Sequence, residues 1–156
     1  QYIPVSALTG EGLELLTREV VKRLPEGPAY FPEDQITDQP ERFLAAEMIR
    51  EKILRLTSQE VPHSVAVVID EWEEGKALTK IGATIFVERS GQKAIVIGSK
   101  GSVLKQIGTE ARRDIEAMLD RKVFLEMFVK VRENWRESPA FLSQLDWRTM
   151  AGGDNE

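Results

Sequence analysis

The first 24 residues change from a short apolar stretch to the spacing of an amphipathic helix. Residues 1–5 predict the end of a strand, and the glycines that follow predict a turn. The next apolar residues lie three or four positions apart, which predicts a helix with one apolar face. These apolar positions are Leu13, Leu16, Val20, Val21 and Leu24. Because a chain rarely begins inside a strand, we expect this sequence to be a piece of a longer protein.

A second helix is predicted from about residue 39 to residue 57, again by apolar residues at helical spacing. Its predicted buried stripe consists of Ala46, Ile49, Ile53 and Leu56. Asp38 and Glu41 have the spacing of a capping box, so we expect the helix to begin there.

Apolar and polar residues then alternate, which is typical of strands with one buried face. Residues 63–72 and 78–89 are two such stretches, and the acidic sequence EEGK between them predicts a hairpin turn. Residues 92–97 are apolar but too short to assign, and residues 122–132 predict a third strand. The side chains predicted to face the core are Val65, Val67 and Ile69, then Ile81, Ala83, Ile85 and Val87, then Val123, Leu125, Met127, Val129 and Val131.

The longest helical pattern lies before the third strand, from about Ser102 to Leu119. Its apolar positions are Leu104, Ile107, Ala111, Ile115 and Met118. After the third strand we expect a short terminal helix held by Trp135 and Trp147. This order of elements predicts an α+β fold, in which helices cover one face of a three-stranded sheet.

Proline content divides the chain. Residues 25–40 contain four prolines and little periodicity, which predicts a linker. We therefore expect an N-terminal unit over residues 1–24, an α+β domain over residues 41–148 and a disordered tail over residues 149–156.

Composition and charge narrow the class of protein. The sequence has no cysteine, so disulfides and thiolate zinc sites are excluded and an intracellular protein is favoured. The formal net charge of −5 argues against nonspecific binding of nucleic acid by the whole molecule. Residues 93–113, however, hold five basic side chains and one acidic side chain, a local charge of +4. Such a segment is a candidate footprint for an anionic partner.

This basic segment surrounds the sequence IGSKGSVLKQIG, residues 97–108. Its two outer loop glycines, Gly98 and Gly101, can adopt conformations closed to other residues and leave room for a ligand. A helix that begins just after Gly101 would direct its free amides and positive dipole end at the loop, where Lys100 adds a full charge. A phosphate backbone could therefore lie over this loop.

Two further basic residues extend the predicted phosphate path along the helix. Lys105 and Arg112 are seven residues apart and therefore share one helix face, offset from the buried stripe. We expect both side chains to line the edge that follows the loop.

The spacing of the glycines distinguishes this loop from two common phosphate-binding loops. It is neither a Walker loop nor the dinucleotide fingerprint G-x-G-x-x-G. A KH module instead clamps about four nucleotides of backbone with a GXXG loop. The isoleucine before the first glycine, and the leucine, lysine and isoleucine in the next helical turns, also resemble the KH signature. Two predicted strands before the loop and one after it resemble the type II KH arrangement.

The flanking sequences resemble one family in particular. YFPEDQITDQPERFLAAEMIREKIL (residues 30–54) and KVFLEMFVKVRENWRES (residues 122–138) are similar to the Era GTPase family, in which a Ras-like GTPase domain precedes a C-terminal KH domain. VSALTGEGLELL resembles the last guanine-nucleotide motif of that GTPase, with Ser6 and Ala7 after a strand and before its final helix. The resemblance covers residues 2–148.

This resemblance implies single-stranded RNA binding near the 3′ end of the small-subunit ribosomal RNA, in assembly of the small ribosomal subunit. It implies that Gly98, Ser99, Lys100 and Gly101 hold the RNA backbone, on the base that Ile97 provides. The family often has two basic residues between the glycines, whereas the first position here is Ser99, which lowers the charge of the loop. A cytoplasmic monomer is expected, with peripheral association with the inner face of the cell membrane attributed to the family.

GTP chemistry requires residues that this sequence does not contain. Phosphoryl transfer needs a phosphate loop with its lysine and a magnesium-binding Ser/Thr and Asp, and the guanine-reading asparagine-lysine-x-aspartate motif is absent too. Ser6 and Ala7 would at most touch a guanine edge. Residues 1–156 are therefore expected neither to bind nor to hydrolyse GTP, whereas a full-length parent would be a GTPase that uses GTP and magnesium.

Other interpretations stay open beside the RNA one. The basic helix could form a membrane-surface or protein-interaction module, although it shows no exposed large apolar residue for insertion. Phe124 and Phe128 lie on the opposite face of the third strand and are expected to pack under helices, with base stacking as the alternative. The acidic hairpin around Asp70 is expected to be a solvated turn rather than a metal site, and His63 a loop residue.

Overall fold

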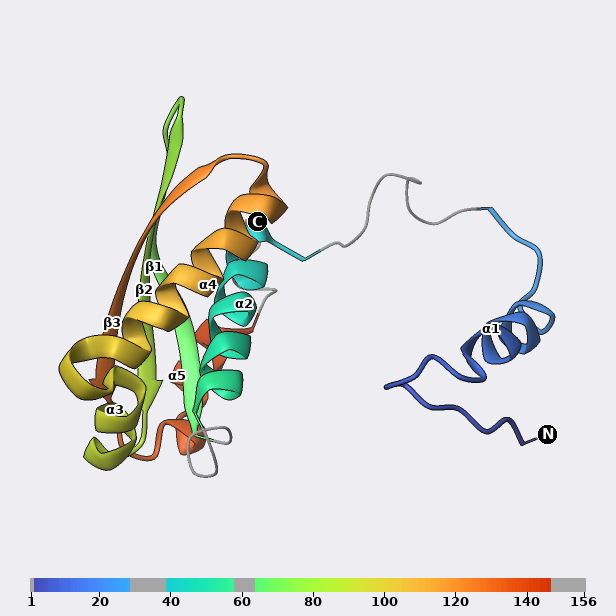
Figure 1. Cartoon of the computed structure of the whole chain (residues 1–156), viewed down its shortest axis with the longest axis horizontal. Coiled ribbons are helices and arrows are strands. Elements are labelled where there is room, and N and C mark those ends of the chain that lie inside the picture. Colours follow the sequence, from blue (N-terminus) through green and yellow to red (C-terminus); the bar gives the residue numbers. More distant parts are fainter. Residues whose placement is uncertain (1, 29–38, 58–63, 147–156) are drawn as a thin grey trace. The chain divides into compact units, whose positions relative to one another are not determined.

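The computed structural model describes residues 2–28, 39–57 and 64–146 (Figure 1). Several predicted features lie outside these described residues: Asp38 of the predicted capping box, His63, Trp147, the tail over residues 149–156 and most of the predicted linker.

Contacts between residues divide the chain into two units, residues 1–37 and residues 38–156. The division falls inside the stretch that the prolines mark as a linker. Each unit is described by itself below.

The first unit contains one helix, α1 (Leu13–Val21), close to the predicted position. No residue of α1 is buried, and its predicted apolar face remains largely exposed, with Val20 at 49% and Leu24, just beyond the helix, at 62%. The strand predicted for the start of the chain does not form in residues 2–5. A strand needs a neighbouring edge for its backbone groups, and no described segment of this unit supplies one.

The second unit is built on a three-stranded sheet in the order β1-β2-β3. The strands β1 (Val65–Glu74) and β2 (Leu78–Val87) form an antiparallel hairpin, in which the Gly75 N–H donates to the Leu78 carbonyl oxygen at 2.9 Å. The third strand, β3 (Lys122–Val131), runs parallel to β2. A parallel pair requires a crossover, and the chain between β2 and β3 supplies it with helices.

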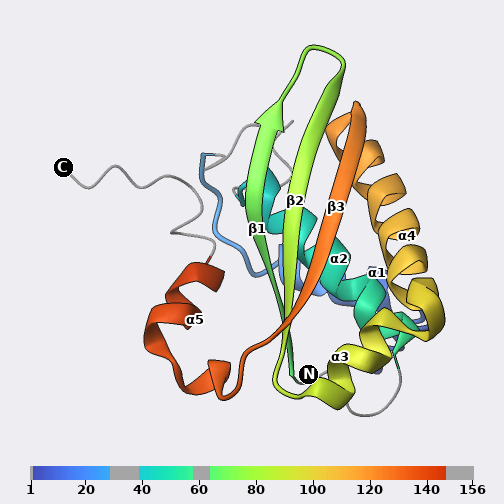
Figure 2. The ribbon, with the colours of Figure 1, turned by 90° about the vertical axis from the view of Figure 1, so that its left-hand side faces the viewer.

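Six helical segments, from three to eighteen residues long, accompany this sheet in the described part of the chain. They are α2 (Glu41–Leu56), α3 (Ser90–Ile97), the short 3₁₀ turn η1 (Ser99–Gly101), α4 (Ser102–Leu119), and after the sheet the 3₁₀ turn η2 (Trp135–Glu137) with α5 (Pro139–Leu145). Figure 2 shows α2 behind the strands, α4 beside β3 and α5 beside the lower end of β1. The predicted α+β architecture with helices on one face therefore holds for α2, α3 and α4.

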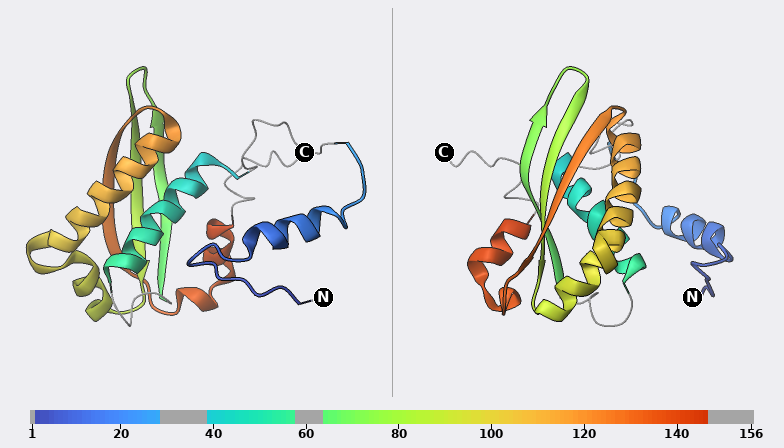
Figure 3. Two further views of the ribbon diagram at one scale, coloured as in Figure 1. Left: turned by 45° about the vertical axis from the view of Figure 1, so that its right-hand side comes forward. Right: turned by 60° about the vertical axis from the view of Figure 1, so that its left-hand side comes forward.

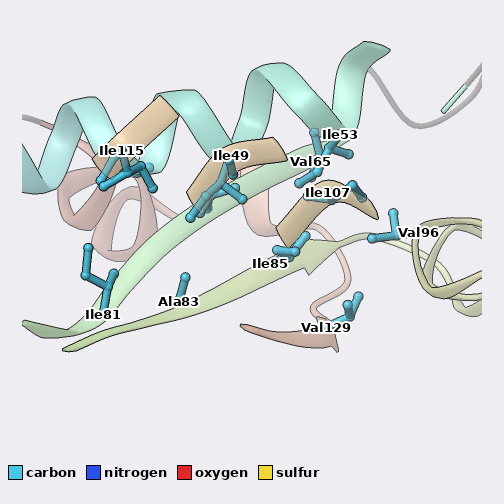
Figure 4. Close-up of a cluster of buried hydrophobic side chains, with 14 of the residues drawn as sticks. Ile49, Ile53, Val65, Ile81, Ala83, Ile85, Val96, Ile107, Ile115 and Val129 are labelled. Carbon is cyan, nitrogen blue, oxygen red and sulfur yellow. The ribbon is translucent and has the colours of Figure 1, made fainter. Parts of the chain in front are cut away.

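Apolar residues from α2, α4 and the inner faces of the strands form the main core (Figure 4). Ile49 and Ile53 of α2, Ile107 and Ile115 of α4, and Ile81 and Ile85 of β2 are fully buried. Each side chain of this size contributes about 1.5–3 kcal/mol on burial, so this layer dominates the stability of the unit. The core fixes the position of α4 and thereby of the loop at its N-terminus.

A smaller cluster covers one end of the other face of the sheet. Trp135 and Phe141 pack on Ala66 of β1 and Phe86 of β2, and the ring centroids of Phe86 and Phe141 lie 4.9 Å apart in an edge-to-face arrangement. The Trp135 indole also donates to the Ser64 carbonyl oxygen at 3.4 Å. The prediction that Trp135 holds the terminal helix is consistent with these contacts.

Several predictions differ from the structure. Phe124 and Phe128 do not pack under helices; they are 51% and 53% exposed, because α5 covers only the far end of their face. Val131 is likewise exposed, since it lies at the end of β3 beyond the core. Helix α2 begins at Glu41 with Pro40 as its N-cap, whereas the predicted cap, Asp38, lies outside the described residues. Residues 92–97, left unassigned from the sequence, belong to α3.

Candidate nucleic-acid interface

The loop between α3 and α4 has a backbone that glycine makes possible. Gly98 ends α3 with φ 72° and ψ 176°, and its N–H donates to the Ala94 carbonyl oxygen at 2.8 Å. Gly101 precedes α4 with φ 79°, and its N–H donates to the Gly98 carbonyl oxygen at 3.2 Å. Between them Lys100 also has a positive φ of 51°. The loop is therefore a tight reversal between two helices that exposes its own backbone.

Gly98 and Gly101 differ in the space that each leaves for a side chain. A Cβ at Gly98 would lie 2.5 Å from Val103 Cγ2 and 2.9 Å from the Val103 backbone nitrogen, so this position has no room for a side chain. A Cβ at Gly101 would have no heavy atom within 4 Å. Gly98 lets the loop close against α4, whereas Gly101 leaves open space over the first turn of α4.

An open groove of about 440 Å³ continues from the loop between α4 and β3. Both views in Figure 3 place α4 alongside the sheet, and α4 lies next to β3 in Figure 2. The groove is lined by Gly101, Leu104, Lys105, Gly108, Thr109 and Arg112 of the loop and α4, and by Leu125 and Met127 of β3. It therefore combines an apolar floor with a basic rim.

Gly108 lines this groove between Lys105 and Arg112. A Cβ at Gly108 would lie 2.9 Å from Met127 Cε, so glycine permits a close approach of α4 and β3. The absence of a side chain here also leaves the path between Lys105 and Arg112 unobstructed.

The basic side chains of the loop and groove are accessible to an anionic ligand. Lys100, Lys105 and Arg112 are exposed and form no ion pair within 4 Å of any acidic group in the described part of the chain. The two groove cations predicted from helical spacing do line the same groove. Ser99 is exposed beside Lys100, and Ile97 is half-buried against the main core, where it supports the loop. The roles of these residues toward RNA stay predictions.

The helix that carries the loop is fixed to α2 by a buried ammonium group. Lys52 of α2 is 3% exposed, and its Nζ lies 2.5 Å from Asp114 of α4 and 2.7 Å from Glu51. The hydrogen bond from Lys52 lowers the pKa of Asp114, and the hydrogen bond to Asp114 raises the pKa of Lys52. This pair holds the two helices together on the side away from the groove residues.

A second contact joins the end of α4 to the start of β3. The Val123 N–H donates to Glu116 Oε1 at 3.1 Å, and this hydrogen bond lowers the pKa of Glu116. Asp120, with a φ of 49°, ends the helix between them. The two walls of the groove are therefore connected directly at one end.

The acidic hairpin forms no metal site in the described part of the chain. Glu71 pairs with Lys80 at 2.8 Å, and Glu74 pairs with Arg121 at 3.3 Å. No three His, Asp or Glu side chains among residues 2–28, 39–57 and 64–146 are placed to share a metal ion. Across the same residues, no helix combines the length and apolarity that a membrane span needs.

Ser6 and Ala7 belong to the other unit and form part of a turn. The Thr9 N–H donates to Ser6 Oγ at 3.3 Å, and the Gly10 N–H donates to the Ser6 carbonyl oxygen at 2.9 Å. No other predicted site residue lies in this unit.

Sequence reasoning missed the apolar half of the groove. Leu104, Leu125 and Met127 were assigned to the core by their periodicity, yet all three are only partly buried and line the groove. The signal was present in Gly108, which interrupts the stripe of α4 and marks the close approach of β3.

This chain is similar to proteins of known family. Residues 60–136 match the KH domain family. The chain is 55% identical over 149 residues to the GTPase Era of Syntrophus aciditrophicus, covering 94% of this chain and 49% of that protein. It is also 55% identical over 146 residues to the GTPase Era of Crocosphaera subtropica, with 94% of this chain and 46% of that protein covered. The chain thus spans about half the length of the curated relatives it matches.

Two solved structures share the fold at 46% sequence identity. One is a crystal structure of an Aquifex aeolicus Era variant bound to GDP·AlF4⁻, with a TM-score of 0.86 over 92% of this chain and 49% of that one. The other is a crystal structure of Era in complex with MgGDPNP and nucleotides 1506–1542 of 16S ribosomal RNA, with a TM-score of 0.87 and the same coverage. The three-stranded mixed sheet and helices of the second unit form a KH domain.

Proposed function

Because this chain belongs to the Era GTPase family and contains the KH domain, we propose that it binds single-stranded RNA through the loop and groove described above. The observation that carries this proposal is the continuity of three features: the Gly98–Gly101 loop, the free amides at the start of α4 and the groove with its basic rim. The loop and Lys100 hold phosphates, and Lys105 and Arg112 continue the path.

The apolar residues of the groove can contact RNA bases. Phosphates held by the loop and the rim would direct bases onto Leu104, Leu125 and Met127. Single strands expose base faces and Watson–Crick edges, which stacking and pairing bury in a duplex, so the groove favours single-stranded RNA.

We propose the 3′ end of the small-subunit ribosomal RNA as the ligand and assembly of the small ribosomal subunit as the process. The support is the related Era structure that contains nucleotides 1506–1542 of 16S ribosomal RNA. The whole protein would be a GTPase that uses GTP and magnesium, as the names of its relatives indicate. Residues 1–156 would contribute RNA binding without binding GTP, which calorimetry with GTP tests. A cytoplasmic monomer in peripheral contact with the cell membrane completes the proposal.

The test compares charge reversal in the loop with the same reversal elsewhere. Lys100→Asp leaves both glycines in place, and aspartate tolerates the positive φ of this position better than most residues. Lys76→Asp makes the same charge change at the exposed hairpin turn. We expect Lys100→Asp to weaken binding of a single-stranded oligonucleotide several-fold, and Ser99→Asp with Lys100→Asp to weaken it at least tenfold, which is about 1.4 kcal/mol.

Lys76→Asp should leave the affinity nearly unchanged, and the melting temperature of every variant should stay close to that of the parent. The logarithm of affinity should fall with the logarithm of salt concentration at a slope of about −1.5 to −3, because about 2–4 phosphates are neutralised. If the two single variants lose affinity equally, diffuse charge and not the loop binds RNA, and the proposal is wrong. Flotation with anionic liposomes tests the membrane-surface alternative with the same variants.

A further inference from the structure

The outward face of β3 carries an exposed row of two aromatic, two basic and one acidic side chain, here called the β3 strip. Alternate residues of a strand point to one face, so the residues between those that line the groove share the opposite face. These residues are Lys122, Phe124, Glu126, Phe128 and Lys130. Figure 2 shows this face of the sheet toward the viewer, with α5 at only one end of it.

The two phenylalanines are unusual for a solvent-facing sheet. Phe124 and Phe128 are 51% and 53% exposed, and neither belongs to the small cluster that α5 forms with Phe86. They are four residues apart on one strand, hence about 13 Å apart along it. At that separation each ring can stack on a base of its own, but the two cannot hold the same base.

The charges of the strip are mixed, with Lys122 and Lys130 at its two ends and the exposed Glu126 between the rings. Lys130 is exposed and forms no ion pair with any described acidic group, and Lys122 is 78% exposed with a single long contact of 3.5 Å to Glu116. Strand β1 carries acidic side chains whose partners on β2 lie next to the rings. Asp70 accepts a hydrogen bond from Thr84, which lies beside Phe128, and Glu71 pairs with Lys80, which lies beside Phe124. Lys130, which has no acidic partner among the described residues, is therefore the position of the strip where a phosphate would be held.

The strip is continuous with the proposed RNA groove. Strand β3 is an edge of the sheet, and its Leu125 and Met127 line the groove while Phe124 and Phe128 point to the opposite face. Only the thickness of one edge strand separates the two surfaces. A GXXG loop clamps about four nucleotides, so a longer strand extends beyond the groove, and the β3 strip is a surface next to it.

We propose that the β3 strip is a second RNA contact, on which two bases of a strand leaving the groove stack against Phe124 and Phe128 while Lys130 meets the backbone. The proposal rests on the RNA-binding function proposed above and extends the site around the edge of the sheet. Base stacking on exposed aromatic rings is tolerant of sequence and contributes appreciably to binding of single strands.

The experiment uses two single-stranded RNAs, a tetranucleotide that fits the groove alone and a twelve-nucleotide strand that contains it. In the double variant Phe124→Ala with Phe128→Ala, affinity for the longer RNA should fall by about tenfold or more, and affinity for the tetranucleotide should change less than twofold. The melting temperature should hold, because both rings are exposed. Leu15→Ala truncates a 44% exposed side chain of α1 and should change neither affinity.

A stacking-specific measurement accompanies the affinities. In Phe128→Trp, the longer RNA should quench the new indole fluorescence more than it quenches that of the parent, and the tetranucleotide should not. Equal loss for both RNAs, or no loss for either, would show that the strip is not a second contact. If the unmodified chain binds neither RNA, the proposed function itself fails and the extension with it, which is distinguishable from failure of the strip alone.

Discussion

Alanine at Gly98 should disrupt the loop far more than alanine at Gly101, although the two glycines are three residues apart and both have positive φ angles. Gly98 has φ 72° and ψ 176°, a region that is essentially restricted to glycine and costs other residues about 1–3 kcal/mol. The added Cβ would also lie 2.9 Å from the backbone nitrogen of Val103, which cannot rotate away as a side chain can. We therefore expect Gly98→Ala to lower the free energy of unfolding by about 3 kcal/mol or more.

Alanine at Gly101 would cause backbone strain but no steric overlap. Its φ of 79° and ψ of 13° lie in the left-handed helical region, where alanine costs about 1–2 kcal/mol, and the added Cβ contacts nothing within 4 Å. Gly91 in α3 has neither a positive φ nor a neighbour at the Cβ position, so Gly91→Ala should be neutral or slightly stabilising. The three variants thus separate steric overlap from backbone strain.

Urea unfolding followed by tryptophan fluorescence measures all three free energies, since every tryptophan of the chain lies in the second unit. The expected order of stability is Gly91→Ala, then Gly101→Ala, then Gly98→Ala. A difference below about 0.5 kcal/mol between Gly98→Ala and Gly101→Ala would refute the argument that contact with Val103 requires glycine.

Three further predictions concern the helices. Lys52→Ala should lower the free energy of unfolding by about 1–3 kcal/mol because it removes the buried cation and leaves Asp114 with only the exposed Arg113. Arg55→Ala, which removes an exposed pair, should cost less than about 0.5 kcal/mol by the same urea titration. Because the folded state lowers the pKa of Asp114 below its ordinary 3.8, its contribution to stability is complete above that pH and is lost as the pH falls through the lower value. Asp114→Asn should therefore flatten the acid side of the stability curve, and an unchanged curve would contradict this. Amide exchange in α1 should be much faster than in α4, because α1 buries no residue; equal protection would show that α1 has a partner surface.

The sequence by itself determined most of the second unit. Alternation in the strands and helical spacing in α2 and α4 predicted the elements and the main core, because burial of apolar side chains on one face selects both period and register. The GXXG loop was also visible, since positive φ angles and close backbone approach require glycine at fixed positions. Lys105 and Arg112 could be assigned to one face because the period of a helix alone decides it.

Only the tertiary structure decided which surfaces remain uncovered. The pattern that placed Leu125 and Met127 inward could not show that Gly108 holds α4 close to β3 and leaves a groove beside both side chains. The same pattern gave Phe124 and Phe128 an outward face, but their exposure depends on how much of the sheet α5 covers. Periodicity reports the direction of a side chain relative to its own backbone. Whether that direction ends in a core, a groove or solvent depends on elements distant in the sequence, whose positions no local pattern contains.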